Sequence, residues 1–193
     1  MTEKLSILCF GNSLTAGFHS YGLEFHPYAQ KLVETIKNEF PGLEVQATVA
    51  GQSGDLVVSP PGAFLSRIEM KCDRTNDLGY GYQPDKIYSA IQKSWNVALE
   101  TGAKVLALTI PECKARIGSL DERRSKLNSY ILAHQAEGLR IPYHSASPEF
   151  QENMFDDGLH LTPAGYDFMG TIIAEHLVSL LNAQMEDKDD KEG

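Results

Sequence analysis

Short apolar runs along the chain alternate with segments in which apolar side chains recur every three or four residues. The short runs predict strands at residues 5–10, 43–50, 104–110 and 139–143. The helical spacing predicts helices at residues 26–40, 84–101 and 119–137, and a last helix that begins at Pro163. This alternation predicts an α/β fold with a mainly parallel sheet that helices cover on both faces. In such folds, functional residues gather at the carboxyl ends of the strands.

Length and local composition predict one domain with a charged end. The chain has 193 residues, which is enough for one core of ordinary size. Its last residues include the charge run EDKDDKE, which is typical of a solvated tail. We expect one domain at residues 1–182 and an acidic, disordered tail at residues 183–193.

The charge of the chain argues against several classes of partner. The formal net charge is -9, and the tail supplies -3 of it from five acids and two lysines, so the body is acidic as well. This charge disfavours a nucleic-acid surface. No apolar stretch approaches the roughly 18 residues of a membrane span, and the polar start does not resemble a signal peptide. We therefore expect a cytoplasmic protein with no membrane span.

Neither the cysteines nor most of the histidines have the spacing of metal ligands. The chain has three cysteines, an odd number without a C-x-x-C pair: Cys9, Cys72 and Cys113. They are expected to be buried free thiols. Five histidines also lack ligand-like spacing and are expected to be structural or surface residues: His19, His26, His134, His144 and His176. No metal and no organic cofactor is expected.

Ser13 lies just past the first predicted strand, in the loop GNSLTAG. Two glycines around it allow a sharp turn that points a helix amino end at the hydroxyl. A serine in such a turn is commonly only a helix cap, so this loop alone does not separate a cap from a nucleophile. A phosphate-binding loop is disfavoured, because the loop has neither the lysine of a P-loop nor a G-x-G-x-x-G pattern.

Asp157 and His160 lie three residues apart in the loop DDGLHLTP, before the last helix. That spacing lets the carboxylate orient the imidazole, which leaves the other ring nitrogen free to take a proton from a hydroxyl. The alternative is a surface histidine beside a helix start, since Thr162 and Pro163 account for that start without catalysis.

Taken together, four loops in order resemble the SGNH/GDSL hydrolase family of serine esterases and acyl hydrolases. The loops are GNSLTAG, GQSGD, TNDLG and DGLH, and they span nearly the whole domain. The resemblance implies a flavodoxin-like three-layer sandwich. It also implies hydrolysis of carboxylic esters, with Ser13 as nucleophile, His160 as base and Asp157 as its orienter.

The same resemblance implies an oxyanion hole and a substrate class. Its donors would be the amides of Ser13 and Gly54 and the side chain of Asn76, with Gly51 as the less favoured glycine. The partner would be a small-molecule ester, hydrolysed without a cofactor. The sequence leaves the acyl specificity and the oligomeric state open.

The chain departs from the family pattern at two places. Asn12 stands where the family has Asp, next to the nucleophile, which we expect to matter little. Before Asn76 the lead-in RIEMKCDR contains no buried strand, and Arg74 replaces a glycine. We expect one central strand to be missing or truncated, and we hypothesise that a short segment before Thr75 is lost. An impaired relative that acts as a binding module is therefore the alternative function.

Overall fold

The centre of the fold is a pair of long parallel strands. The computed structural model describes residues 3–70, 78, 80–114, 118–134, 138–139 and 152–192. Strands β1 (Lys4–Asn12) and β4 (Glu44–Gln52) pair in parallel from Lys4 opposite Glu44 to Asn12 opposite Gln52. Helix α2 (Ala29–Glu39) lies between them in the chain and makes the crossover that a parallel pair requires.

Shorter elements complete the described part of the chain. Between β1 and α2 come α1 (Ser13–Ala16), β2 (Phe18–His19), η1 (Ser20–Gly22) and β3 (Glu24–Phe25). After β4 come α3 (Phe64–Met70), α4 (Pro84–Glu100), β5 (Ala107–Leu108), α5 (Gly118–Ala133), β6 (Gly138–Leu139) and α7 (Pro163–Glu192).

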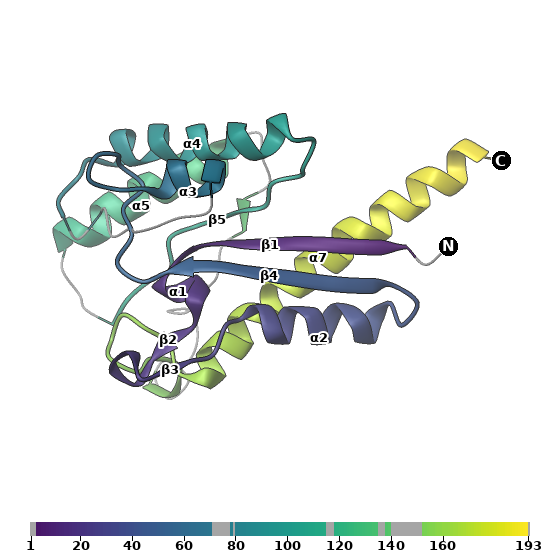
Figure 1. Ribbon diagram of the computed structural model, residues 1–193, viewed down its shortest axis with the longest axis horizontal. Helices are drawn as coiled ribbons and strands as arrows, with labels where there is room; N and C mark the ends of the chain where they lie inside the picture. Colours follow the sequence, from purple (N-terminus) through teal and green to yellow (C-terminus); the bar gives the residue numbers. More distant parts are fainter. Residues whose placement is uncertain are drawn as a thin grey trace.

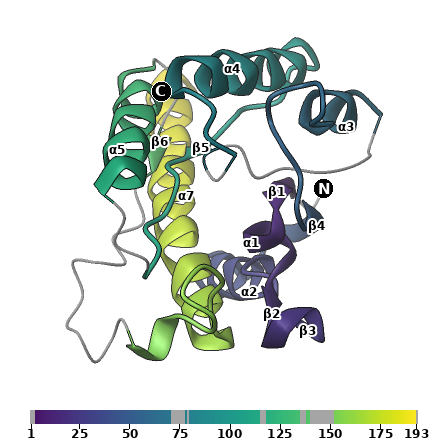
Figure 2. The same ribbon diagram turned by 90° about the vertical axis from the view of Figure 1, so that its left-hand side faces the viewer.

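The helices lie on both sides of the central strands. In Figure 1, α2 lies below β1 and β4 and α3, α4 and α5 lie above them, whereas α7 runs diagonally from below these strands to above them. Figure 2 shows α2 and α4 on opposite sides of β1 and β4 from a second direction. β1 pairs with β4 and β5 with β6, both in parallel, and the short β2 and β3 pair in antiparallel. The predicted α/β class with a mainly parallel sheet is confirmed.

Two clusters of buried apolar residues correspond to these two sides. The first joins β1 and β4 to α2 and α7 around Leu32, Ile36 and Tyr166, which are at most 1% exposed. The second joins α4, α5 and β5 around Ile87, Leu127 and Ile131. Burying one such leucine or isoleucine contributes about 1.5–3 kcal/mol, so each cluster can hold its own side of the sheet.

The strand predictions for the amino-terminal half are confirmed, whereas the one at residues 104–110 is wrong in length. β1 contains the whole predicted strand 5–10, and β4 contains all of the predicted strand 43–50 except its first residue. β5 has only two residues, because its partner among the described residues, β6, also has two. Apolar composition makes a segment suitable for a strand, but only neighbours with matching hydrogen bonds make it one. Of the predicted strand 139–143, residues 140–143 lie outside the described residues.

The expected gap in the sheet falls partly on residues 71–77, which lie outside the described residues. In the described part of the chain, no strand pairs with both β1 and β5. Residues 64–70, in the segment where the sequence shows no strand, form helix α3. On the face of β1 opposite the first cluster, Leu8 is 53% exposed, which is unusual for a leucine in a central strand.

α7 continues beyond the predicted end of the domain. The helix runs to Glu192, although we expected disorder from residue 183. Residues 182–186 are exposed, and their side chains, such as those of Ala183, Gln184 and Glu186, suit a helix that nothing packs against. Figure 1 shows this end of α7 projecting from the body. The domain boundary at residue 182 stays a prediction.

Cys9 and Cys113 are buried, as expected, whereas Cys72 lies outside the described residues. Burial raises the pKa of the Cys9 thiol, against a smaller lowering by its hydrogen bond with Tyr28. Among the described residues, no helix is long and apolar enough to cross a membrane. The described residues also contain no group of three or more histidine, cysteine or acidic side chains that could hold a metal ion.

Gly170 of α7 allows the close approach of α2. A Cβ added at Gly170 would lie 2.4 Å from the Tyr28 carbonyl oxygen, which is backbone and cannot rotate away. Gly170→Ala should therefore lower the free energy of unfolding by about 1–3 kcal/mol in urea titrations, despite the higher helix propensity of alanine. Gly118→Ala is the matched control, because a Cβ there meets nothing within 4 Å. Equal effects of the two substitutions would contradict this packing.

Candidate active site

The Ser13 hydroxyl is presented by a single helical turn directly after β1. The Asn12 side chain accepts a hydrogen bond from the Leu14 N–H at 3.1 Å and so caps α1, while Gly17 ends the turn with a left-handed φ of 77°. Asparagine and aspartate cap helices equally well, which explains why the departure at Asn12 leaves the turn intact. Ser13 is 5% exposed, and its position is confirmed at the carboxyl end of a central strand.

Asp157 and His160 lie in a tight turn just before α7. One Asp157 oxygen accepts the backbone N–H groups of Leu159 (3.0 Å) and His160 (2.7 Å). The other accepts from His160 Nδ1 at 2.7 Å. An isolated bridge between Phe155 and Leu161 closes the turn. The carboxylate is therefore held by the backbone while it holds the imidazole, as the spacing of the two residues predicted.

The imidazole reaches Ser13 across the fold. His160 Nε2 lies 3.0 Å from Ser13 Oγ, although 147 residues separate the two in the chain. Because a carboxylate only accepts hydrogen bonds, Nδ1 carries the ring proton and Nε2 is left to accept from the serine hydroxyl. The three side chains thus form a hydrogen-bonded chain with the polarity that proton transfer from a serine requires.

The charge on Asp157 is favoured within this turn. Partial burial on its own raises the pKa of Asp157. The hydrogen bond with the His160 ring, those from the backbone of His160 and Leu159, and the charge of His160 together outweigh burial and hold this pKa below its ordinary value of 3.8. The carboxylate is therefore ionised at neutral pH and available to stabilise an imidazolium.

The two glycines considered for the oxyanion hole differ in their surroundings. Gly51 lies inside β4, and a Cβ there would come within 2.1 Å of the backbone nitrogen of Ala16. Its lack of a side chain lets α1 pack on β4. Gly54 lies in the turn after β4 with a φ of 80°, and a Cβ added there would meet no atom of the described residues within 4 Å. Asn76, the third predicted donor, lies outside the described residues.

A buried arginine, which the sequence analysis did not single out, ties the ends of β1 and β4 to the loop that carries Gly54. The Arg67 guanidinium donates to the Gly11 carbonyl at 3.0 Å from two nitrogens, and it also donates to the Ala50 carbonyl and to Asp55. Arg67 is 4% exposed and Asp55 0%, so this ion pair is desolvated. Its guanidinium also lies 4.5 Å from the Phe10 ring centre. The sequence pattern that could have indicated this role is a charged residue, Arg67, in a helix that also has an apolar face.

The Phe18 ring packs against the catalytic histidine candidate. Its centre lies 4.5 Å from that of the His160 ring. The Phe18 carbonyl accepts from the Tyr166 hydroxyl at 2.7 Å, and the Ser20 N–H donates to Asp156 at 2.7 Å. These contacts join β2 and η1 to the Asp157 turn, and no sequence pattern indicated them.

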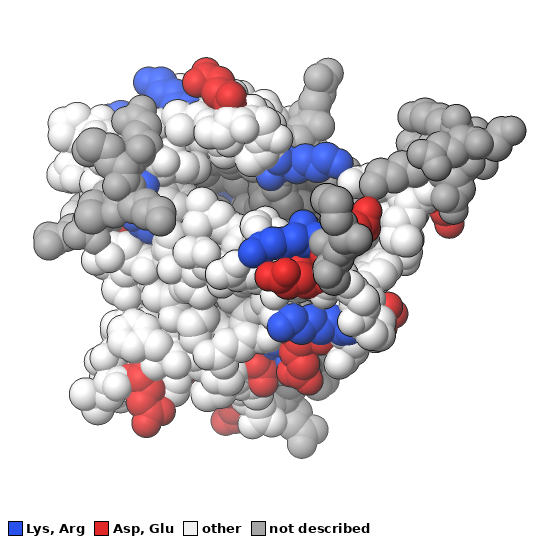
Figure 3. Space-filling model, turned by 45° about the vertical axis from the view of Figure 1, so that its right-hand side comes forward, with Lys and Arg blue, Asp and Glu red and all other residues white. Residues whose placement is uncertain are grey.

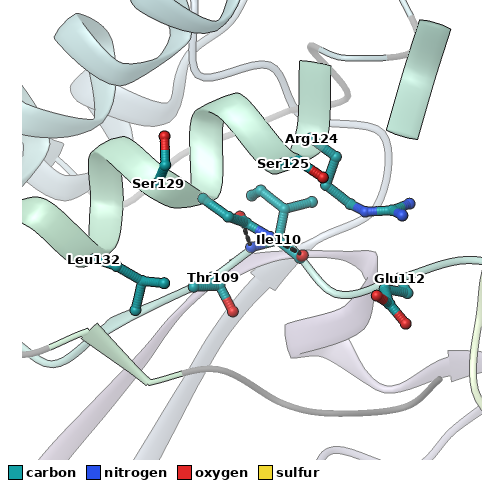
Figure 4. A pocket seen from close by; sticks show the side chains of 8 residues that line it. Thr109, Ile110, Glu112, Arg124, Ser125, Ser129 and Leu132 are labelled. Carbon is teal, nitrogen blue, oxygen red and sulfur yellow. Dashed lines mark hydrogen bonds between the residues drawn. The ribbon is translucent and has the colours of Figure 1, made fainter. Parts of the chain in front are cut away.

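A separate pocket lies between the end of β5 and α5. Its volume is about 210 Å³, and Figure 4 shows Thr109, Ile110, Glu112 and Arg124 among the residues around it. The Asn128 side chain bonds both the N–H (2.8 Å) and the C=O (2.9 Å) of Ile110, so this amide completes backbone hydrogen bonding. None of Ser13, Asp157 and His160 lines this pocket.

The sequence and the fold agree on one family. A profile of the GDSL-like lipase/acylhydrolase family matches residues 9–168, which include all three residues of the hydrogen-bonded chain. The chain belongs to this family. A comparison of this chain with curated protein sequences finds no match.

Solved structures of other family members share the fold. A lipolytic protein of the G-D-S-L family from Veillonella parvula has a TM-score of 0.65 at 20% identity, over 88% of this chain and 96% of the other. A lipase/acylhydrolase from Enterococcus faecalis has a TM-score of 0.63 at 20% identity, over 92% and 96%. AlinE4, an SGNH-hydrolase family esterase, has a TM-score of 0.60 at 22% identity, over 97% and 98%.

Removal of the Arg67 guanidinium should break its buried ion pair with Asp55 and its hydrogen bonds to the Gly11 and Ala50 carbonyls. Arg67→Met should lower the free energy of unfolding by about 3–5 kcal/mol in urea titrations. The control is Lys31→Met, which breaks the exposed pair with Glu34 and should cost at most about 1 kcal/mol. A loss for Arg67→Met no larger than that control would contradict the role of this ion pair.

The lowered pKa of Asp157 makes a prediction about acid stability. Its ionised form stabilises the fold above the ordinary pKa of 3.8, and this contribution is lost as pH falls through the lower, folded pKa. The difference in free energy of unfolding between the parent chain and Asp157→Asn should be largest near neutral pH and shrink below pH 3.8. A difference that is constant with pH would refute it.

Proposed function

We propose that the protein is a serine hydrolase that cleaves carboxylic esters through Ser13, His160 and Asp157. The observation that carries this proposal is the hydrogen-bonded chain from Asp157 to His160 Nδ1 and from Nε2 to Ser13 Oγ, at 2.7 and 3.0 Å. Membership of a lipase/acylhydrolase family supports the same chemistry. Because the hydrogen bonds from Asp157 to His160 and from His160 to Ser13 are both present, catalysis is favoured over the alternative of an impaired binding module.

The first half of the reaction makes an acyl-enzyme. Ser13 Oγ attacks the ester carbonyl carbon while its proton passes to His160 Nε2, and the carbonyl electron pair moves to oxygen. Asp157 stabilises the imidazolium that forms. As the tetrahedral intermediate collapses, the bond to the alcohol oxygen breaks and Nε2 returns the proton to that oxygen, which leaves as the free alcohol.

The second half repeats these transfers with water. His160 takes a proton from a water molecule that attacks the acyl-enzyme, and it then gives the proton to Ser13 Oγ as the carboxylic acid leaves. We assign the negative oxygen to the amides of Ser13 and Gly54 and to the side chain of Asn76. Gly54 is the better candidate, because its open surroundings leave room for a substrate, whereas Gly51 packs against α1. No cofactor enters any step.

Loss of the nucleophile should abolish ester hydrolysis. Ser13→Ala should lower kcat/KM for p-nitrophenyl acetate and butyrate by about 10³- to 10⁶-fold, and it should end labelling by a fluorophosphonate probe. Asp157→Asn should lower kcat by about 10⁴-fold while the probe site remains. Ser129→Ala is the control, because that hydroxyl lies exposed on α5. Turnover that survives Ser13→Ala would remove Ser13 from the mechanism.

The oxyanion assignment has a separate test. Asn76→Ala should lower kcat by about 10²- to 10³-fold with little change in KM, because the donor acts on the transition state. Fluorophosphonate labelling of Ser13 reports on the nucleophile in the same variant. Unchanged kcat would show that Asn76 does not reach the oxyanion.

A further inference from the structure

A hairpin of apolar side chains follows the nucleophile turn. It consists of β2, η1 and β3, and its side chains are unusually exposed: Tyr21 is 86%, Leu23 84% and Phe25 57% exposed. Single exposed apolar residues are ordinary on a protein surface, but three within five residues form a patch. Such a patch next to a reactive serine suggests recognition of an apolar ligand.

The patch is continuous with the reacting groups. Phe18 links the two, since its ring centre lies 4.5 Å from the His160 ring and 6.0 Å from the Phe25 ring. A Cβ added at Gly22 would lie 2.6 Å from the Phe18 ring, so the hairpin tip folds back over that ring. Ring contacts therefore run from the imidazole through Phe18 to Phe25, in the same hairpin as Tyr21 and Leu23.

The hairpin is fixed to the loops that position the reactive side chains. The Ser20 N–H bonds Asp156, the Tyr166 hydroxyl bonds the Phe18 carbonyl, and the His26 N–H bonds the Gly17 carbonyl, each at 2.7 Å. Figure 2 shows β2 and β3 beside the green turn that precedes α7. Because the surface is held in place before a ligand arrives, a ligand need not order it on binding.

The charges near the hairpin disfavour an anionic ligand. Glu24, in the hairpin, has a side chain that is 69% exposed, and Asp156 and Asp157 lie in the neighbouring turn. Lys114 contacts that turn through its backbone, since its N–H donates to the Gly158 carbonyl at 2.7 Å. On the face shown in Figure 3, basic and acidic side chains lie side by side, without a large patch of one sign. Carboxylates around an apolar surface would repel an anionic acyl group or head group.

We propose that this hairpin binds the acyl chain of the substrate. With an ester carbonyl at Ser13, the chain would lie along Phe18 and Phe25 and reach the exposed side chains of Tyr21 and Leu23 in the same hairpin, so the preferred substrates are neutral esters with acyl chains longer than acetate. This assignment rests on the proposed function, and it names the substrate class for the same site. Tyr21 and Leu23 bind the chain but take no part in bond breaking.

The test compares acyl chain lengths in variants of the hairpin tip. The measured quantity is kcat/KM for p-nitrophenyl acetate, butyrate and octanoate, each below its aggregation limit. The parent chain should prefer octanoate to acetate. Tyr21→Ser with Leu23→Ser should reduce this preference by about tenfold or more, chiefly through a higher KM for octanoate, because apolar contacts bind ground state and transition state alike.

A matched control replaces exposed apolar residues elsewhere. Leu99 and Met185 are 46% and 51% exposed, near the ends of α4 and α7 that lie away from the hairpin in Figure 1. Leu99→Ser with Met185→Ser should keep the parent preference. An equal loss of preference in the control, or equal losses for acetate and octanoate in the hairpin variant, would overturn the proposal.

Two further results distinguish the acyl-chain site from a failure of the proposed function and from a role of the patch in joining copies of the chain. A parent chain that neither hydrolyses acetate nor takes the fluorophosphonate label would overturn the proposed function, and the acyl site with it. A hairpin variant with parent chain-length preference but a smaller oligomer in size-exclusion chromatography would show that the patch joins copies of the chain. That result would overturn the acyl site and leave the proposed function intact.

Discussion

The parallel register of β1 and β4 is the constraint on which the rest of the site depends. Nine residue pairs, from Lys4 with Glu44 to Asn12 with Gln52, bring both strands to an end at one edge of the sheet. The Ser13 turn and the Gly54 turn follow from those ends, so the proposed nucleophile and the proposed oxyanion amide come from loops that follow paired strands. A shift of one residue would turn Ser13 to the opposite face. Arg67 secures that edge, because it bonds a carbonyl near the end of each strand.

The parts of the fold that the sequence predicts best are those with a local cause. β1, β4 and the helices α2, α4, α5 and α7 follow from hydrophobic spacing and from glycine or proline at their ends. The Asp157 turn is equally local, since three residues separate the carboxylate from the imidazole that it holds. The convergence of that turn with Ser13 is not local, and only the order of the four family motifs indicated it before the structure did.

The features that sequence reasoning missed depend on contacts between distant segments. From the sequence alone, Arg67 would be expected on the surface of a short helix. It is buried because Asp55 and two carbonyl groups near the strand ends accept its hydrogen bonds. The sequence gives Phe18 only as an aromatic residue in a loop, and its contact with the His160 ring depends on the fold. The length of β5 depends on a partner strand rather than on its own composition. In each case the deciding neighbour lies elsewhere in the chain.

Because the two apolar clusters are separate, the loss of a strand pattern before Asn76 should affect one side of the proposed site more than the other. Ser13 and His160 flank elements of the first cluster, which β1, β4, α2 and α7 build without α3, α4 or α5. In the sequence, Asn76 follows α3 and precedes α4, and α4 belongs to the second cluster. A lost segment before Thr75 would therefore displace Asn76, the proposed oxyanion donor, while Ser13 and His160 kept their geometry. Such a chain would still activate Ser13 but would stabilise the tetrahedral intermediate less, so the defect would lower kcat without removing the reactive serine.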